Sequence, residues 1–431
     1  LKQFIMKSSK KNYVLPIAIM FALFFMIAFV TGLQNPFGVI VKNQFGASNF
    51  LSQLGNLANF IAYACMGIPA GYILGKIGYR KTALLAIVIG FAGVSITFIS
   101  GQAASFGIYL CGALVSGFSM CILNTVVNPM LNTLGGGGNK GNQLIQFGGV
   151  CNSTAATIVP VLVGYLMGQD EAARTIAKAN PALFIAMGIF ALAFIVLAVS
   201  KIPEPSFEKS GGSEEKKSTD KYSALSFRHF VLGIIAIFVY VGIEVGIPNI
   251  SNLYMTESLK MDPAIAGSLV GTYWFLMLIG RLVGGAIGAK VSSKAMLSTV
   301  SIIGLVLVIA AIFSPESTKV TMPVFRSNIS FGMASVPMNV MFLVLCGLCT
   351  SVMWGGIFNL AVEGLGKYTA AASGIFMVMV CGGGVLPAIQ GFVADTFSFM
   401  QSYWIIAAAL AYLLFYAIAG SKNVNKNIPV D

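Results

Sequence analysis

Twelve runs of predominantly apolar residues, each about 20 residues or longer, follow one another along this chain. A helix needs about 20 residues to cross the ~30 Å hydrocarbon layer of a bilayer. Inside that layer every backbone polar group must be satisfied within the protein, and a helix does this by itself. We therefore predict an all-α membrane protein with twelve transmembrane helices. The predicted spans are residues 14–37, 50–74, 82–101, 106–131, 142–168, 182–200, 229–253, 264–289, 295–314, 336–362, 370–394 and 401–420.

The amount and placement of charge agree with this class. Charged residues make up only 9% of the 431 positions, against roughly 25% in a soluble domain. Placing both termini in the cytoplasm puts 19 of the 26 Lys and Arg residues in cytoplasmic segments and 6 outside, with Arg281 at the inner end of a span. This asymmetry follows the positive-inside rule. The net charge of +12 therefore indicates orientation in a lipid bilayer rather than a nucleic-acid partner.

The strongest internal boundary is the segment 201–228, which is polar, charged and contains Gly, Ser and Pro. Such a composition is typical of a flexible linker. It separates a predicted six-helix half at 1–200 from a second at 229–431. That division is the parallel-repeat plan of many secondary transporters.

Catalytic and metal sites are not indicated by the sequence. All seven cysteines fall within spans, so no disulfide framework is predicted. The single histidine, His229, lies at a span entrance beside Arg228, where we expect a solvated residue. We find no metal-ligand spacing, no pairing of a nucleophile with a base, and no loop long enough for a signalling domain. We therefore expect neither an enzyme nor a sensor, and no cofactor beyond a co-transported H⁺ or Na⁺.

Glu244 is the one carboxylate deep inside an apolar span, because every other acidic residue falls in a loop or near a span end. An ionisable group at that depth costs at least ~2.5–3.5 kcal/mol on insertion scales and marks a functional site by default. Gly242, Gly246 and Pro248 surround it, and proline clashes with the preceding helical turn. We predict that the helix bends or breaks just after Glu244 and that Glu244 carries a coupling ion. The alternative is a tolerated kink with a protonated, hydrogen-bonded Glu244.

Amide and aromatic side chains recur at helical spacing inside the spans. Amides both donate and accept hydrogen bonds, and Trp and Tyr rings stack on the apolar faces of a sugar, so a neutral polyol suits such a lining. The alternative is that each amide only joins helices, at ~0.6 kcal/mol. The predicted substrate-binding residues are Asn56, Asn124, Asn128, Gln146, Tyr273, Trp274, Trp354 and Asn359.

Two further charged residues lie at the inner ends of spans in the second half. An ion pair of Glu363 with Arg281, or with Lys290, is predicted to latch the cytoplasmic side when that side is shut. Opposite charges a few ångströms apart attract in this way.

Characteristic motifs are spread over nearly the whole chain. They are Phe24-Phe25 before 31–35, 67–71, Asn128-Pro129, 240–245, Tyr273-Trp274 with Gly280-Arg281, and, as the most specific, 353–368. They resemble the major facilitator superfamily, and within it the fucose permease and bacterial glucose/galactose transporter group. The resemblance implies a monomeric sugar transporter of the bacterial inner membrane that works by alternating access. The loop after the second span matches only partly, because Gly75 stands where an Asp is usual.

The resemblance to fucose permease also implies one acid in the first span and one in the fourth, both tied to proton-coupled sugar binding. Asn35 and Asn124 stand at those positions here. An amide still forms hydrogen bonds but does not titrate, so Asn35 joins the predicted substrate-binding residues and Glu244 remains the predicted ion carrier. We therefore predict a proton- or sodium-coupled symporter of a hexose-like sugar. An uncoupled uniporter and an exporter of lipid-like or drug-like amphipathic cargo are the alternatives.

Overall fold

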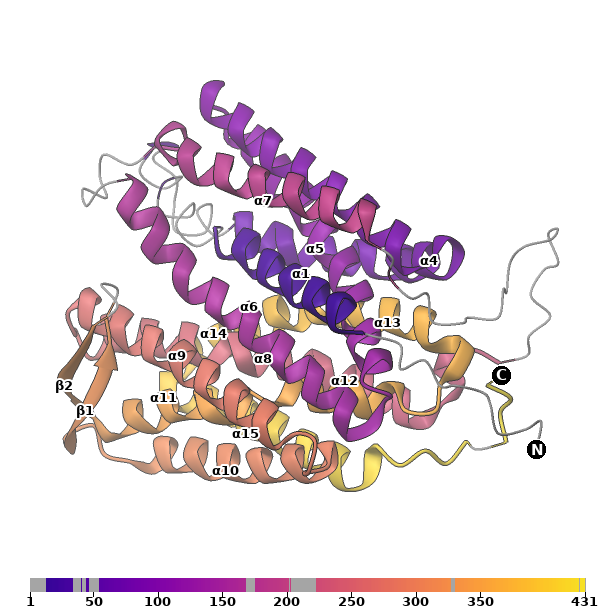
Figure 1. The fold of residues 1–431 in the computed structure, drawn as a ribbon. Helices are drawn as coiled ribbons and strands as arrows, with labels where there is room; N and C mark the ends of the chain where they lie inside the picture. Colours follow the sequence, from indigo (N-terminus) through magenta and orange to yellow (C-terminus); the bar gives the residue numbers. More distant parts are fainter. Residues whose placement is uncertain are drawn as a thin grey trace, which may run out of the picture.

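The computed structural model describes residues 13–33, 40, 44–45, 54–167, 175–200, 202, 222–326, 330–425 and 427–430. The helices form two bundles, the first half of the chain above the second in Figure 1. The upper bundle contains α1 (Val14–Gly32), α4 (Leu54–Gln102), α5 (Phe106–Leu134), α6 (Gly138–Met167) and α7 (Asn180–Val199). The lower bundle contains α8 (Arg228–Leu253), α9 (Pro263–Ile287), α10 (Ser293–Phe313), α11 (Met338–Thr350), α12 (Met353–Val362), α13 (Thr369–Val378), α14 (Gly382–Thr396) and α15 (Phe399–Phe415). Most of the predicted linker 201–228 lies outside the described residues.

Local sequence signals account for several helix ends. Ser105, Ser292 and Ser398 precede α5, α10 and α15, and each side chain accepts a hydrogen bond from a backbone N–H of the first turn. Such caps satisfy donors that a helix start leaves without a partner. Inside α4, Gly78 has φ 79° and ψ 173°, a conformation open to glycine, and the helix changes direction there. Thus α4 comprises both predicted spans 50–74 and 82–101.

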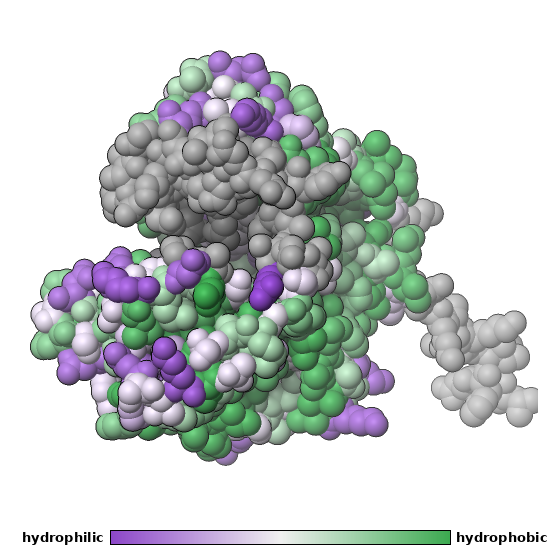
Figure 2. All heavy atoms as spheres, turned by 90° about the vertical axis from the view of Figure 1, so that its left-hand side faces the viewer, coloured by the Kyte–Doolittle hydropathy of each residue, from purple (hydrophilic) through white to green (hydrophobic). Residues whose placement is uncertain are grey.

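Within the described residues, ten helices are long and apolar enough to cross a membrane. Because α4 holds two of the predicted spans, and α6 covers the predicted span 142–168, the helices are consistent with twelve crossings. Large apolar side chains remain exposed on the outside of the bundles, among them Leu192, Val306 and Phe392. Figure 2 shows hydrophobic residues gathered on the flanks of the molecule. So large an exposed apolar surface indicates a lipid-facing protein.

The prediction that the helix bends or breaks after Glu244 is wrong as to the break. Helix α8 continues through Glu244 and Pro248 to Leu253, and a π-helical turn, Tyr254–Ser258, follows it. The interruption lies instead in the tenth predicted span, where α11 ends at Thr350 and α12 begins at Met353. A 3₁₀ turn, Met379–Cys381, likewise separates α13 from α14. Neither interruption contains a proline, so the proline pattern pointed to the wrong span.

A small antiparallel sheet adds to the otherwise helical fold. Strands β1 (Lys319–Phe325) and β2 (Phe331–Pro337) pair between α10 and α11, with Lys319 opposite Pro337 and Phe325 opposite Phe331. They lie at one end of the bundles in Figure 1, which we call the hairpin end. The opposite end, where residues 422–425 lie, is the tail end.

The most extensive contacts between the halves are made by two helix pairs, α6 with α9 and α4 with α13. At the second pair glycines allow backbones to touch: a Cβ atom on Gly374 would lie 2.5 Å from the carbonyl oxygen of Gly67 and 2.8 Å from the Cα of Gly71. Small residues permit such close helix crossings in membranes. The two bundles diverge toward the hairpin end in Figure 1. The contacts that position the candidate site are therefore those between these four helices and their neighbours.

Candidate functional site

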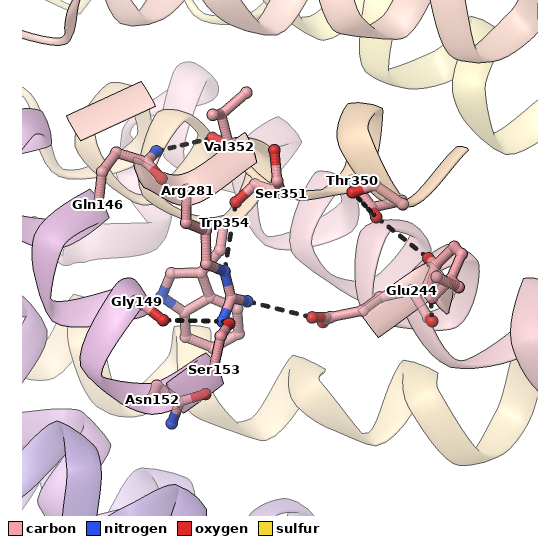
Figure 3. A network of polar contacts seen from close by, with 12 residues as sticks. Gln146, Gly149, Asn152, Ser153, Glu244, Arg281, Thr350, Ser351, Val352 and Trp354 are labelled. Atoms are coloured by element: carbon pink, nitrogen blue, oxygen red, sulfur yellow. Dashed lines mark hydrogen bonds and ion pairs between the residues drawn. The ribbon is translucent and has the colours of Figure 1, made fainter. Parts of the chain in front are cut away.

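The buried carboxylate of Glu244 forms an ion pair with Arg281. Nη2 of Arg281 lies 3.3 Å from Oε1 of Glu244, and the two side chains are 10% and 15% exposed. Glu244 is on α8 and Arg281 on α9, and their side chains point toward one another in Figure 3. Removing one partner of a buried pair leaves an uncompensated charge and destabilises the protein, so the favourable burial of each charge requires the other. The carboxylate that the sequence left without a partner thus has a cationic one.

Arg281 also binds the opposite half of the molecule. Its Nη1 donates to the carbonyl of Gly149 at 3.1 Å and to Oγ of Ser153 at 2.6 Å, both on α6. Its Nε donates to the carbonyl of Ser351 at 3.4 Å, in the interruption between α11 and α12. Gly149 makes room for this approach, because a Cβ there would lie 3.1 Å from Cδ of Arg281. One guanidinium therefore ties Glu244, the interrupted span and the other half together.

The predicted latch between Arg281 and Glu363 is corrected by this geometry. Arg281 is buried and directed at Glu244, whereas Glu363 is exposed at the tail end, where α12 stops. The backbone carbonyl of Glu363 is 2.9 Å from Nε2 of His229, which is itself buried rather than solvated as expected. Arg281 lies about a turn and a half before the end of α9, so its side chain meets groups deeper in the bundle.

Neutral polar residues form the wall contributed by the first half. Asn124 donates from Nδ2 to Oη of Tyr63 at 2.7 Å. Asn128, one turn further along α5, donates to the backbone carbonyl of Asn124 at 2.8 Å and accepts from Nε1 of Trp354 at 2.9 Å. Since Trp354 belongs to α12, the last bond crosses between the halves. The amides predicted from helical spacing do share one face of α5.

Aromatic rings line the facing wall. The ring of Trp354 lies edge-on to Tyr240, with centroids 6.3 Å apart, and edge-on to Phe376 at 5.9 Å. Tyr240 is one turn before Glu244 on α8, so the aromatic wall is continuous with the ion pair. Trp354 is only partly buried, as a ring that contacts a ligand must be. Amides, aromatic faces and one ion pair thus meet between the halves.

Two predicted substrate-binding residues lie in contacts that join the halves closer to the tail end. Asn359 accepts from Nδ2 of Asn132 at 2.6 Å and donates to Oγ of Ser293 at 2.9 Å. Gln146 donates from Nε2 to the carbonyl of Val352 at 2.9 Å. At the interruption of the tenth span the carbonyl of Ser351 accepts from Arg281, and the carbonyl of Val352 accepts from Gln146 in addition to the backbone N–H of Gly356. These bonds occupy the polar groups that the sequence assigned to substrate.

The remaining predicted residues divide into three groups. Tyr273 is 1% exposed and its hydroxyl bonds to groups of the protein, so its ring lies behind Glu244. Trp274 is partly buried and packs edge-on against Tyr273, with centroids 5.4 Å apart. Asn35 lies outside the described residues, as does the side chain of Asn56. The structure therefore links Asn124, Asn128 and Trp354 by hydrogen bonds, and the ring of Trp354 contacts Tyr240, which lies one turn before Glu244 on α8.

Sequence reasoning missed several partners of the ion pair. Ser153, Thr350 and Ser351 are polar residues in the middle of spans, a signal that was available. Asn132 lies one turn beyond Asn128 on the same helix face, and it too was visible from spacing. The backbone carbonyls of Gly149 and Ser351 could not be identified from side-chain type. The packing of α6 against α9 was needed to show that the carbonyl of Gly149 accepts from Arg281.

Comparisons with known proteins agree with this architecture. The Major Facilitator Superfamily matches residues 20–386 as a family. The glucose/galactose transporter of Brucella abortus is 27% identical over 428 residues, which cover 96% of each chain. The L-fucose-proton symporter of Escherichia coli is 20% identical over 406 residues, covering 89% of this chain and 88% of that protein. The crystal structure of FucP in the outward conformation has a TM-score of 0.80 at 20% identity, over 95% of this chain and 100% of that one. The predicted fold class is confirmed.

Proposed function

This chain belongs to the Major Facilitator Superfamily, and we propose that it is a secondary active transporter of a neutral, hexose-like monosaccharide. The observation that carries the proposal is a polar contact between the halves, where Asn128 donates to the carbonyl of Asn124 and accepts from the indole N–H of Trp354. Amides offer paired donors and acceptors to hydroxyl groups, and an aromatic ring offers an apolar face. Relatives aligned over nearly their whole length are named for glucose, galactose and fucose transport, which supports a sugar as the cargo.

Transport proceeds by alternating access of the site to the two sides of the membrane. Polar bonds that cross between the halves join Asn132 to Asn359, Gln146 to Val352 and Gln143 to the carbonyl of Gly285 at 2.9 Å. These bonds lie toward the tail end, and the bundles diverge toward the hairpin end. The positive-inside rule places the tail end in the cytoplasm. The described conformation therefore corresponds to a state closed toward the cytoplasm.

Glu244 is the coupling residue, and a proton is the coupling ion. The guanidinium of Arg281 already occupies a position 3.3 Å from the carboxylate, so a second cation beside Glu244 would be repelled. Hard cations such as Na⁺ prefer several oxygen ligands. A proton instead neutralises the carboxylate and weakens its hold on Arg281, which in turn binds Gly149 and Ser153 of the other half. Protonation of one residue thereby reaches the interface between the halves.

The same proposal includes the location of the protein in the cell. The relatives of this chain are bacterial proteins, and the transporter resides as a monomer in the bacterial inner membrane. Lipid covers the apolar flanks, and a sugar is the small-molecule partner. Reporter fusions at the C-terminus test the orientation: activity of a reporter that works only outside the cytoplasm would contradict it.

Uptake of labelled monosaccharides into proteoliposomes tests the function. We expect saturable uptake of at least one hexose, with accumulation when a proton gradient is imposed and none when only a sodium gradient is present. Absence of saturable sugar uptake under every gradient would overturn the sugar proposal. Accumulation driven by sodium alone would overturn the assignment of the proton. Saturable uptake without accumulation under either gradient would identify a uniporter.

A further inference from the structure

Pro248 removes one backbone hydrogen bond from α8 at the position of Glu244. In an α-helix the N–H of each residue donates to the carbonyl four residues earlier, so the missing donor of Pro248 would have paired with the carbonyl of Glu244. The helix nevertheless continues through both residues. A buried carbonyl without a partner is unfavourable, and another group must therefore satisfy it.

The hydroxyl of Tyr273 satisfies that carbonyl. Its Oη donates to the backbone oxygen of Glu244 at 3.3 Å and lies 3.1 Å from Oγ1 of Thr350. Tyr273 and Thr350 are each only 1% exposed. Gly347 permits this packing, because a Cβ there would lie 2.3 Å from the carbonyl oxygen of Tyr273. The hydroxyl is thus held between α8, α9 and α11, out of contact with the space between the halves.

Helix α9 consequently contacts Glu244 at two points, its backbone carbonyl and its side-chain carboxylate. Tyr273 binds the backbone of Glu244, and Arg281, about two turns further along α9, binds its carboxylate. The same α9 packs against α6 of the other half. A shift of α9 along α8 would therefore disturb both contacts together.

We propose that Tyr273, supported by Thr350, is a positioning residue that sets the Glu244 carboxylate against Arg281, and that it does not bind the sugar. This inference rests on the proposed function in one respect, the role of Glu244 in ion coupling. The donor that Pro248 lacks is the reason that this tyrosine is required. It follows that restoring a backbone N–H at residue 248 makes the hydroxyl dispensable.

A double-mutant cycle of Tyr273→Phe and Pro248→Ala tests the inference in the full-length protein. In the wild-type background, Tyr273→Phe should lower the maximal rate of proton-driven uptake about tenfold and move its pH profile, with the KM for sugar changed by less than about twofold. In the Pro248→Ala background the same substitution should have little effect, because the backbone N–H restored at position 248 donates to the carbonyl of Glu244. Equal losses in both backgrounds, or a rise in KM alone, would overturn the inference.

Tyr403→Phe is the matched control. Its hydroxyl donates to the carbonyl of Ile247 on the same helix at 3.1 Å, and the residue is fully buried. Residue 251 is a serine, so the carbonyl of Ile247 keeps its helical donor. We expect Tyr403→Phe to give the same small effect in both backgrounds and no change of pH profile. A displacement of the pH profile equal to that of Tyr273→Phe would overturn the special role of Tyr273.

Thermal unfolding in detergent separates this inference from the proposed function. Tyr273→Phe should lower the unfolding midpoint by about 2 °C in the wild-type background and leave it unchanged in the Pro248→Ala background. If the wild-type protein took up no sugar while this thermal cycle held, the proposed function would fail and the contact at Glu244 would stand. Additive shifts in midpoint would overturn the contact itself, whatever the protein transports.

Discussion

The two halves contribute different chemistry to the space between them. The first half offers neutral groups, Asn124 and Asn128, which are bonded to Tyr63 and Trp354. The second half offers the ion pair of Glu244 and Arg281. Neutral amides recognise hydroxyl groups without a change of protonation, whereas a buried carboxylate responds to protons. Under the proposed function, we therefore expect sugar recognition to rest mainly on the first half and ion coupling on the second.

Replacing the acid of the second half should have the largest effect. Glu244→Gln removes the titrating group, so we expect loss of proton-driven accumulation with sugar counterflow retained, because the amides of the first half are unchanged. Uptake and counterflow in proteoliposomes measure the two activities separately. Asp395→Asn, which changes an exposed carboxylate of the same half, is the control. Undiminished accumulation by Glu244→Gln would assign coupling elsewhere or to no residue.

Breaking the ion pair from its cationic side tests the dependence of each partner on the other. Arg281→Gln leaves Glu244 as an unpaired buried carboxylate, and we expect a loss of about 3–5 kcal/mol in stability. The double variant Glu244→Gln, Arg281→Gln removes both charges and should regain most of that loss. Thermal and denaturant unfolding in detergent provide the comparison. A double variant no more stable than Arg281→Gln would contradict a direct pairing.

Placing an acid in the first half should make sugar recognition by that half depend on pH. Asn124→Asp introduces a titratable group where the wild-type site is neutral. The substitution replaces the Nδ2 donor that now bonds Tyr63 with a carboxyl O–H, and ionisation removes that O–H donor. We expect the KM for sugar to change about tenfold between about pH 5 and about pH 8, measured by counterflow at each pH. Asn124→Leu is the control, since it loses the hydrogen bonds without gaining a charge. An equal pH dependence in both variants would remove Asn124 from the recognition site.

The smallest effect is expected at a single bond between the halves. Asn132→Ala removes the hydrogen bond to Asn359, which is worth about 1 kcal/mol, or about a fivefold shift between conformations. Spin labels are placed at the exposed residues Thr133 and Glu363, one on each half, with native cysteines replaced. In Asn132→Ala a larger fraction of molecules should show the longer distance between the labels, which corresponds to separated halves. Asn425→Ala is the control, because that amide bonds Arg228 within one half. Identical distance distributions in both variants would show that this bond does not hold the halves together.

Much of the architecture could be predicted because transmembrane helices are specified locally. The length of each apolar run and the polar segment at 201–228 required no knowledge of packing. Glu244 was recognisable for the same reason, since a lone acid in an apolar run is a local anomaly. The wall of Asn124 and Asn128 also followed from helical spacing alone. Predictions of this kind depend on one segment at a time.

Predictions that required two segments to meet were the ones that failed. Pro248 suggested a bend or break in α8, but the helix does not break, and Tyr273 from another helix donates to the carbonyl of Glu244. The tenth span is interrupted without a proline, and Arg281 of another helix donates to the carbonyl of Ser351 there. The position of Pro248 in the sequence thus predicted which backbone hydrogen bond of α8 would be missing. The tertiary structure decided whether a partner was available.

The sequence by itself determined that this chain crosses a membrane many times and that Glu244 lies deep inside an apolar span. Hydrophobic burial and the need to satisfy the backbone act on each run of residues separately. Only the tertiary structure decided that Glu244 pairs with Arg281, 37 residues away, and that the hydroxyl of Tyr273 donates to the backbone carbonyl of Glu244. Those outcomes depend on distances between groups on different helices, which no single segment encodes.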